Sequence, residues 1–356
     1  MSNQTSGHVC AHHHLYSSLA RGMPANKTTP NNFLEILKNV WWRLDNALDD
    51  QMIYWSAMLG ATEALISGTT CIIDHHESPN FIDGSLSLIK SACEQVGVRV
   101  NACYGVTDRW DDLGQLHSKV SPLSKMTDAA KRGLEECDRY LSQGGRGMVG
   151  VHAAFTCSDE TLNAASELAA KHKVGVHIHV AEGLDDVHAG ARLESLTRDN
   201  WLLIHAVHLD RKLSGYVVHN PRSNMNNSVG YAKPSAIKNK ILLGTDGIGA
   251  DMLEEARLAF VRLREYDIEQ TPSTVWSWLE NGYEIFPEAK SDKVTYNYDH
   301  LDSPWHVAFT PGVRATDVEV NGEKLVVAGL PTRVDIQEVR AKAAEQSIRL
   351  HQRLAI

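Results

Sequence analysis

The sequence alternates short apolar runs with longer amphipathic stretches, and this alternation limits the possible folds more than any other feature. Eight runs have the length and β-branched content of strands, and most are followed by apolar residues three or four positions apart, as in a helix. Such a succession is typical of parallel strands joined by helices. The predicted strands are 8–12, 70–74, 98–105, 148–154, 174–180, 201–207, 216–219 and 241–245. The predicted helices between them include 51–67, 82–96, 127–142 and 159–172.

Eight strands of this kind predict a (β/α)8 TIM barrel. A doubly wound sheet is the structural alternative, but no glycine-rich nucleotide-binding turn follows the first strand. Asp128 and Ser158 are expected to cap the third and fourth helices. One place fits badly, because only 209–215 separates the sixth and seventh strands, whereas a parallel crossover needs about a dozen residues. Either a strand prediction is wrong there or the chain has lost a segment.

The 356-residue chain is longer than the roughly 250 residues of a typical barrel, which leaves room for an appendage. The segments predicted beyond the barrel strands are helices at 251–266, 273–283 and 335–354, with strands at 294–299 and 317–328. The last strand segment is a predicted hairpin that turns at Asn321–Gly322. We therefore expect a barrel, the C-terminal strands of a small, incomplete β-sandwich and a terminal helix, at 8–290, 291–333 and 334–356.

Composition excludes several classes of partner. The formal net charge is -9 and no basic run of five residues occurs, which argues against a nucleic-acid or anionic-membrane partner. The six cysteines are scattered without a C-x-x-C pair, so neither a disulfide framework nor a cysteine zinc site is indicated. There is no apolar signal region and no run of 18 apolar residues. We expect a reduced, cytoplasmic protein.

Histidines and acids gather at the carboxyl ends of five predicted strands. In the stretch VGVHIHVAE (174–182), His177 and His179 share one face, and Glu182 follows just past the strand. The other four ends carry His12 with His14, His205, His219 and Asp246. In a parallel barrel all of these ends lie at one mouth. Three imidazoles and a carboxylate suit Zn²⁺ or Fe²⁺ better than Mg²⁺.

Each of these residues also has a simpler explanation when it is taken alone. The triplet at 12–14 could be tag-like surface decoration, His205 a core histidine and Asp246 part of a Thr-Asp-Gly turn. The residues at all five strand ends would have to be explained in such ways for the metal site to be wrong, so the barrel pattern favours the site. His75 and His76, which end the second strand, are expected to be structural or to support the site.

Several motifs carry a resemblance to a known family. Four of them are AHHHLYSSLARGM (11–23), HIHVAE (177–182), HNPRSNMNN (219–227) and LGTDGIGADM (243–252). In this order they resemble the amidohydrolase superfamily, specifically its nucleobase- and triazine-deaminase branch. Two further stretches are most similar to the SsnA-type aminohydrolases of that branch: NNFLEILKNVWWRLDNALDD (31–50) and GTTCIIDHHESP (68–79).

The resemblance implies one divalent metal ion, with zinc as first choice and iron as second. Its implied ligands are His12, His14, His179 and Asp246. Glu182 and His205 would contact the water that the ion activates, and Asp246 would help to hold it. Two-metal members of the superfamily carry a modified lysine on the fourth strand, which has no lysine here. The usual N-terminal sandwich strands are missing before His8, and the chain is shorter than expected after His208 and within 283–300.

The implied activity is the replacement of an amino group on a purine-, pterin- or triazine-like ring by water, with Glu182 moving the protons. Alternatives are a chlorohydrolase or another carbon–nitrogen hydrolase with the same metal site, or a non-catalytic accessory protein of purine or selenium metabolism. Relatives suggest a homodimer. The residues expected to contact the small-molecule ring are His219, His152, Phe155 and Trp42.

Overall fold

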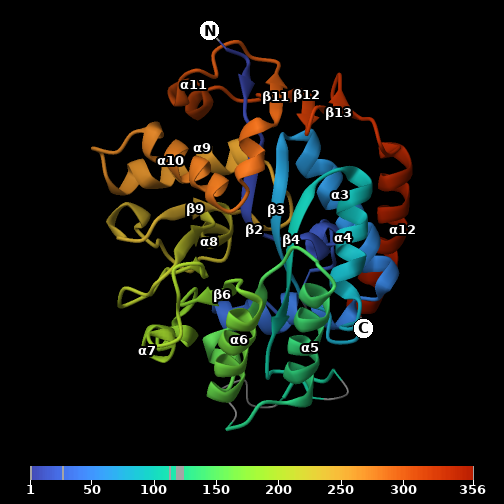
Figure 1. The fold of residues 1–356 in the computed structure, drawn as a ribbon, viewed down its shortest axis with the longest axis vertical. Helices are drawn as coiled ribbons and strands as arrows, with labels where there is room; N and C mark the ends of the chain where they lie inside the picture. The colour runs from blue at the N-terminus through green and yellow to red at the C-terminus, as the bar shows by residue number, and fades with distance from the viewer. Residues whose placement is uncertain (1, 26–27, 112–113, 118–123, 356) are drawn as a thin grey trace.

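The computed structural model describes residues 2–25, 28–111, 114–117 and 124–355, which form a parallel barrel with a small antiparallel sheet at one end (Figure 1). The barrel strands are ordered β10-β2-β3-β4-β5-β6-β7-β8-β9. Their bounds are β2 (His8–His14), β3 (Thr69–His76), β4 (Arg99–Val106), β5 (Val149–Ala153), β6 (Val176–Val180), β7 (Leu202–His205), β8 (Tyr216–His219), β9 (Ile241–Leu243) and β10 (Asp246–Gly247). Each predicted strand overlaps one of these, so the (β/α)8 prediction is confirmed.

The barrel closes because its last strand is split in two. β9 pairs with β8, and the chain then continues as β10, which pairs with β2. Between them, Gly244 N donates to the carbonyl of His219 and Thr245 N donates to the carbonyl of His12, both at 3.0 Å. A Cβ on Gly244 would lie 2.8 Å from the backbone nitrogen of His12, so glycine permits this close approach. The closure sets Asp246 beside the end of β2.

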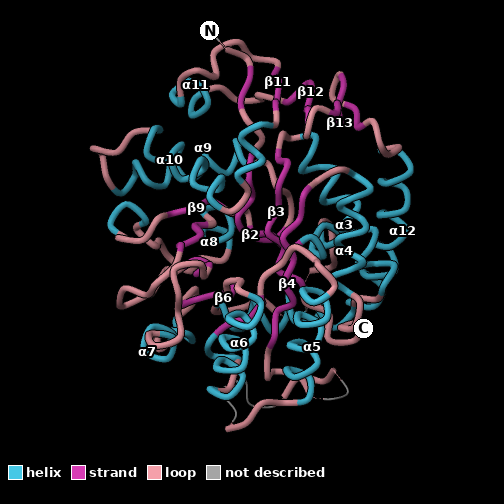
Figure 2. Tube along the Cα trace, in the orientation of Figure 1, coloured by secondary structure: helices cyan, strands magenta, loops and turns pink. Residues whose placement is uncertain are grey.

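Helices surround the strands (Figure 2). The longer ones are α3 (Asp50–Ile66), α4 (Ser85–Val96), α5 (Asp128–Ser142), α6 (Asp159–His172), α9 (Met252–Tyr266), α10 (Pro272–Glu280) and α12 (Ile336–Leu354), and the shorter ones are α1 (Phe33–Ile36), α2 (Trp42–Ala47), α7 (Ala189–Leu193), α8 (Pro221–Asn226) and α11 (Pro304–Phe309). Ser158 caps α6 as predicted, but Thr127, not Asp128, caps α5. Asp128 occupies the first turn, where a negative charge still favours the helix dipole. None of the described helices is both long and apolar enough to cross a membrane.

Two layers of buried apolar side chains hold the barrel together. In β3, Cys71 and Ile73 belong to the cluster inside the barrel, whereas Ile72 packs in the outer layer between the strands and the helices. In β8, Val218 lies inside and Val217 outside. Because side chains alternate along a strand, this division also decides which strand-end residues face the interior.

The short link between β7 and β8 is real, and both strand predictions were right. The two strands are parallel and pair directly, and residues 206–215 join them without a helix. Each strand has only four residues. The link must therefore run back along a strand about 13 Å long, at roughly 3.3 Å per residue. Residues 206–215 in an extended conformation are long enough to do so.

A second sheet is antiparallel, with the order β1-β11-β12-β13-β14. Its strands are β1 (Gln4–Thr5), β11 (Lys293–Tyr296), β12 (Ala315–Val320), β13 (Glu323–Val327) and β14 (Leu330–Pro331). The predicted hairpin turn is confirmed: Asn321 and Gly322 connect β12 and β13 with φ of 51° and 81°, as a two-residue turn of this type requires. β1 brings the N-terminal segment to β11 (Figure 1). The domain limits at 290 and 333 stay a prediction.

We expect Asp292→Ala to lower the free energy of unfolding by about 3 kcal/mol, because it would strip a partly buried arginine of its carboxylate. Arg99, at the start of β4, holds the buried Asp292 through two hydrogen bonds of 2.6 and 3.0 Å and also contacts Asn321 at 2.5 Å. This contact joins the barrel to the small sheet. Urea unfolding measures the change.

The matched control is the neighbouring Lys293→Ala. Lys293 lies 3.5 Å from Glu319 and is 63% exposed, so its loss should change the unfolding free energy by less than about 0.5 kcal/mol. Equal effects of the two substitutions would contradict the special role of the Arg99–Asp292 pair.

Candidate metal centre

A bulge in β2 turns two histidines into the barrel. Val9 and Cys10 pair with Cys71 and Ile72 of β3, but the register shifts before His13, which pairs with Asp74, so Ala11 and His12 together lie opposite Ile73. An extra residue of this kind inverts the alternation that follows it. His13 therefore points outward, with Nδ1 2.9 Å from the Thr245 hydroxyl, while His12 and His14 point inward. The predicted shared face of His12 and His14 depends on this bulge.

The inner histidines use Nδ1 for hydrogen bonds within the protein. His14 Nδ1 donates to the carbonyl of His75 and His179 Nδ1 to the carbonyl of His152, each at 2.6 Å. His205 Nδ1 donates to Asn224 Oδ1 at 2.7 Å. A carbonyl oxygen only accepts, so the rings of His14 and His179 carry their protons on Nδ1 and leave the Nε2 lone pair free. His205 Nδ1 also lies 3.3 Å from Asn220 Nδ2, but its shorter contact with Asn224 Oδ1 favours the same tautomer.

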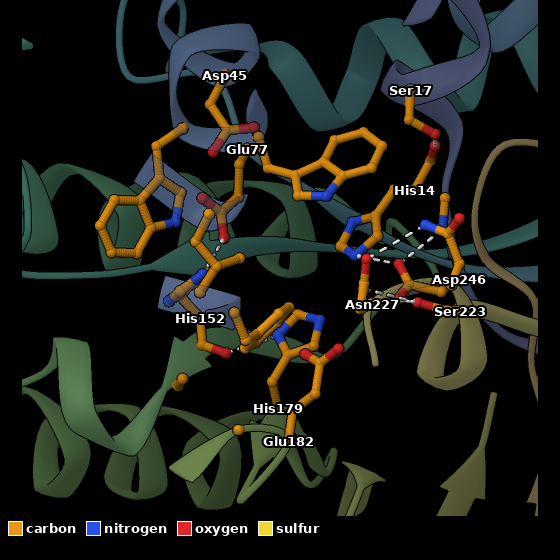
Figure 3. Close-up of a pocket in the computed structure, with 18 of the residues that line it drawn as sticks. His14, Ser17, Asp45, Glu77, His152, His179, Glu182, Ser223, Asn227 and Asp246 are labelled. Atoms are coloured by element: carbon orange, nitrogen blue, oxygen red, sulfur yellow. Dashed lines mark hydrogen bonds and ion pairs between the residues drawn. The ribbon is translucent and has the colours of Figure 1, made fainter. Parts of the chain in front are cut away.

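Asp246 lies among these free nitrogens, and Figure 3 shows its carboxylate beside the His14 ring. Its Oδ1 is 3.3 Å from His14 Nε2 and 3.7 Å from His12 Nε2, and its Oδ2 is 3.6 Å from His205 Nε2. Ser223 Oγ donates to Oδ2 at 2.6 Å, which orients the carboxylate. The backbone of Asp246 has a φ of 60°, a conformation that costs energy for a residue with a side chain.

The environment favours the neutral imidazole at His12 and His179 and the ionised carboxylate at Asp246. Burial lowers the pKa of His12 and of His179 well below the ordinary value. Burial opposes the ionised form of Asp246, but the proximity of His12, His14 and His205 holds its pKa well below the usual range. Neutral imidazoles and an ionised carboxylate are the forms that ligate a metal ion.

Glu182 lies just past β6, beside His205. Its Oε2 is 3.3 Å from His205 Nε2, and its Oε1 has no hydrogen-bond partner among the described residues. Burial first, and the charge of Asp246 second, raise the pKa of Glu182 well above its ordinary value. A carboxyl group whose pKa is raised in this way holds a proton more readily than a free one and can transfer it.

The donor atoms fit a divalent metal ion. Candidate ligand atoms lie within 4.8 Å of one another in three overlapping groups: His12–His179–His205, His12–His14–Asp246 and Glu182–His205–Asp246. The Nε2 atoms of His12 and His205 are buried and have no hydrogen-bond partner among the residues described. Unpartnered buried nitrogens are costly, and this set of imidazoles with a carboxylate suits zinc or iron.

A pocket opens above this centre, and aromatic side chains form much of its wall. Its empty volume is about 1170 Å³, including the open mouth. His14, His179, Glu182 and Asp246 line its floor, and the aromatic lining consists of Tyr16, Phe33, Trp41, Trp42 and Phe155. A flat ring stacks favourably on such side chains. Of the residues predicted to contact a ring, His152, Phe155 and Trp42 line this pocket.

The structure does not bring His219 to the pocket, which corrects its predicted position. Val218 takes the inward place in β8, so His219 points outward by alternation. It packs instead against Tyr231 and Trp278, with ring centroids 5.9 and 6.2 Å away. Arg222, from the same motif, does line the pocket, where it bonds to the carbonyls of Thr245 and Gly247.

Sequence reasoning missed a buried ion cluster in the pocket wall. Arg109 pairs with Asp45 Oδ2 at 2.8 Å and with Glu77, and it lies over the Trp42 ring with its guanidinium 5.1 Å from the centroid. Asp45 and Glu77 line the pocket, with Glu77 beside His152 (Figure 3). Glu77 and Arg109 each follow a barrel strand closely, as Glu182 does. The strand-end criterion, applied to the second and third strands, would therefore have found both.

Comparisons of sequence agree with this architecture. The chain matches the model of the Amidohydrolase family over residues 5–279. It is 29% identical to a 5'-deoxyadenosine deaminase from Methanopyrus kandleri over 95% of this chain and 84% of that protein. It is 30% identical to a 5'-deoxyadenosine deaminase from Methanococcus maripaludis (strain C6), over 71% of this chain and 62% of that protein. The chain thus spans less than two thirds of the length of the Methanococcus relatives.

Solved structures share the fold. An adenosine deaminase from Xanthomonas campestris with bound zinc has a TM-score of 0.79 at 18% identity, covering 98% of this chain and 86% of that one. An atrazine chlorohydrolase from Arthrobacter aurescens, complexed with zinc, has a TM-score of 0.73 at 19% identity, covering 97% and 88%. The predicted resemblance to the deaminase branch is confirmed, and the match along most of its length shows that the chain belongs to the amidohydrolase family.

Proposed function

We propose that this protein is a metal-dependent aminohydrolase that replaces an amino group on a purine-like ring with water. The observation that carries the proposal is the convergence of free imidazole nitrogens and Asp246 beside the buried Glu182, at the floor of an aromatic pocket. The proposed ligands of one ion are His12, His14, His179 and Asp246. Zinc is our first choice and iron our second. A cytoplasmic homodimer is also proposed.

A bound zinc ion supplies Lewis acidity and lowers the pKa of water to about 7. His205 accepts a hydrogen bond from the attacking water through its free Nε2, because its Nδ1 is committed to Asn224. Asp246 orients the same water from the other side. Together they hold the water against the ring carbon that bears the amino group.

Glu182 moves the protons. It donates its proton to the adjacent ring nitrogen and takes one from the water as the carbon–oxygen bond forms. It then passes that proton to the amino group, which leaves as ammonia when the carbon–nitrogen bond breaks, and it regains a proton from the new hydroxyl as the carbonyl forms. The side chain ends as it began. Trp42, Phe155 and His152, on the pocket wall, bind and orient the ring.

The names of the relatives suggest which substrates to test first. Curated relatives are named 5'-deoxyadenosine deaminase, so 5'-deoxyadenosine and adenosine head the panel. Guanine, isoxanthopterin and aminotriazines complete it. Ammonia release that requires metal supports the proposal. Bound metal without release from any of these rings favours the alternative, another hydrolysis at the same centre such as removal of chloride from a triazine, or an accessory role.

Glu182→Gln should keep the metal and lose ammonia release by about 10²–10⁴-fold, since the amide cannot carry the proton. The assay is ammonia release at saturating substrate, with metal measured in the same sample. Glu135→Gln, a carboxylate that is 62% exposed on α5, is the control and should behave as wild type. A fully active Glu182→Gln would contradict the proton-transfer role.

His179→Ala should lose bound metal and activity together, because one of the proposed ligands is gone. Metal content by mass spectrometry after dialysis against a weak chelator is the measurement. The control, His188→Ala, removes an exposed histidine and should retain both. Retention of metal by His179→Ala would place the ion elsewhere.

A further inference from the structure

His12 differs from His14, His179 and His205 in the hydrogen-bond partner of its Nδ1 atom. His14 and His179 donate to backbone carbonyls and His205 to an amide oxygen, all of which can only accept. The Nδ1 atom of His12 instead lies 3.2 Å from Nε2 of His177. An imidazole nitrogen can donate or accept, so this partner does not by itself decide where the proton of His12 resides.

The contact continues away from His12 through a second imidazole to a carboxylate. His177 Nδ1 lies 2.9 Å from His75 Nδ1, and His75 Nε2 lies 3.5 Å from Glu77 Oε1. His75 and His177 are fully buried, and Glu77 is 2% exposed. Arg109 pairs with the other oxygen of Glu77, which keeps the carboxylate ionised and in place.

One direction of proton donation suits the whole chain. Glu77 Oε1, an ionised carboxylate oxygen 3.5 Å from His75 Nε2, forms an ion-pair contact and not a hydrogen bond there, but it favours a proton on that nitrogen, so His75 accepts at Nδ1. His177 then donates from Nδ1 and accepts at Nε2, and His12 donates from Nδ1. In the opposite direction, His75 Nε2 would point a lone pair at the negatively charged carboxylate of Glu77. His12 would then carry its proton on Nε2, in place of the lone pair that faces Asp246.

Gly105 of β4 supplies an independent observation. A Cβ at this position would lie 2.4 Å from His75 Nε2 and 2.7 Å from Glu77 Oε1. β4 therefore has no side chain at the point where His75 approaches Glu77. Any larger residue there would separate His75 from Glu77.

We propose that Glu77, acting through His75 and His177, sets the tautomer of His12 and so prepares its Nε2 to bind the metal. His75, His177 and Glu77 are positioning residues, and the inference rests on the proposed metal site. The path also connects the metal centre to the pocket wall, because Glu77 lines the pocket. The backbone carbonyls of His75 and His152 serve the same purpose for His14 and His179.

The same residues have a competing assignment. His75, His177 and Cys103 place three possible ligand atoms within 4.8 Å of one another, which could hold a second ion. Cys103 Sγ, however, donates to the carbonyl of Asp74 at 3.4 Å, and the His75–His177 contact is a hydrogen bond. These hydrogen bonds, together with the 3.7 Å contact of Cys103 Sγ with His75 Nδ1, account for the cluster without an ion.

The test measures zinc affinity by chelator competition, with the thermal midpoint of the metal-free protein recorded for each variant. His177→Phe should weaken zinc binding about 10–100-fold, the usual cost of removing a group that orients a ligand. His177→Gln should restore most of the affinity, because the amide can accept from His12 and donate to His75. Gly105→Ala should weaken binding in the same direction without removing any polar group.

The control is His76→Phe. His76 follows His75 on β3 but points out of the barrel, with Nε2 2.8 Å from the Ser78 hydroxyl. It should bind zinc as wild type does, even if its thermal midpoint falls. The proposal is wrong if His177→Phe binds zinc normally, or if His177→Gln is as weak as His177→Phe.

Nitrogen-15 NMR of the metal-free, histidine-labelled protein separates this inference from the proposed function. The His12 resonances, assigned by their loss in His12→Asn, should show a proton on Nδ1 and a bare Nε2. That pattern in a protein that binds no zinc would support the hydrogen-bonded chain and reject the metal site. The reverse tautomer would overturn the inference, as would two zinc ions per chain with one lost in Cys103→Ser.

Discussion

The bulge in β2 is the constraint on which the metal centre depends. One extra residue between Cys10 and His13 inverts the alternation of the strand, so that His12 and His14 replace His13 inside the barrel. Where the barrel closes, β10 pairs with His13 and His14 and thereby brings Asp246 to the end of β2. Without the bulge, His13 would face the interior and the ligand set would be broken.

Buried polar atoms without hydrogen-bond partners are unfavourable in the interior of a barrel, yet the metal centre contains such atoms. Most buried polar groups in proteins have partners, yet Nε2 of His12 and of His205 have none among the described residues. Asp246 adds a strained backbone and an ionised carboxylate. Such costs concentrate where a ligand relieves them, and a divalent ion bound by these atoms would do so.

The groups that hydrogen-bond to the Nδ1 atoms of the histidines are as important for the metal centre as the atoms that face it. Two backbone carbonyls and one amide oxygen commit the Nδ1 atoms of three histidines, and an imidazole commits that of the fourth. The ion cluster of Arg109, Asp45 and Glu77 anchors one wall of the pocket beneath Trp42. A rigid network of hydrogen bonds of this kind fixes the orientation of catalytic groups before the substrate binds.

The order and type of the elements could be predicted because each follows from local periodicity. The types of residue at the strand ends, histidine and acid, likewise indicated a metal-binding hydrolase and a family. Tertiary structure decided which of them face one another. His219 and Glu77 both lie at or near strand ends, yet the first points outward and the second into the pocket. A bulge exists only in the pairing of two strands, and the link from His177 to His75 joins residues about a hundred positions apart, so neither can be read from a local pattern.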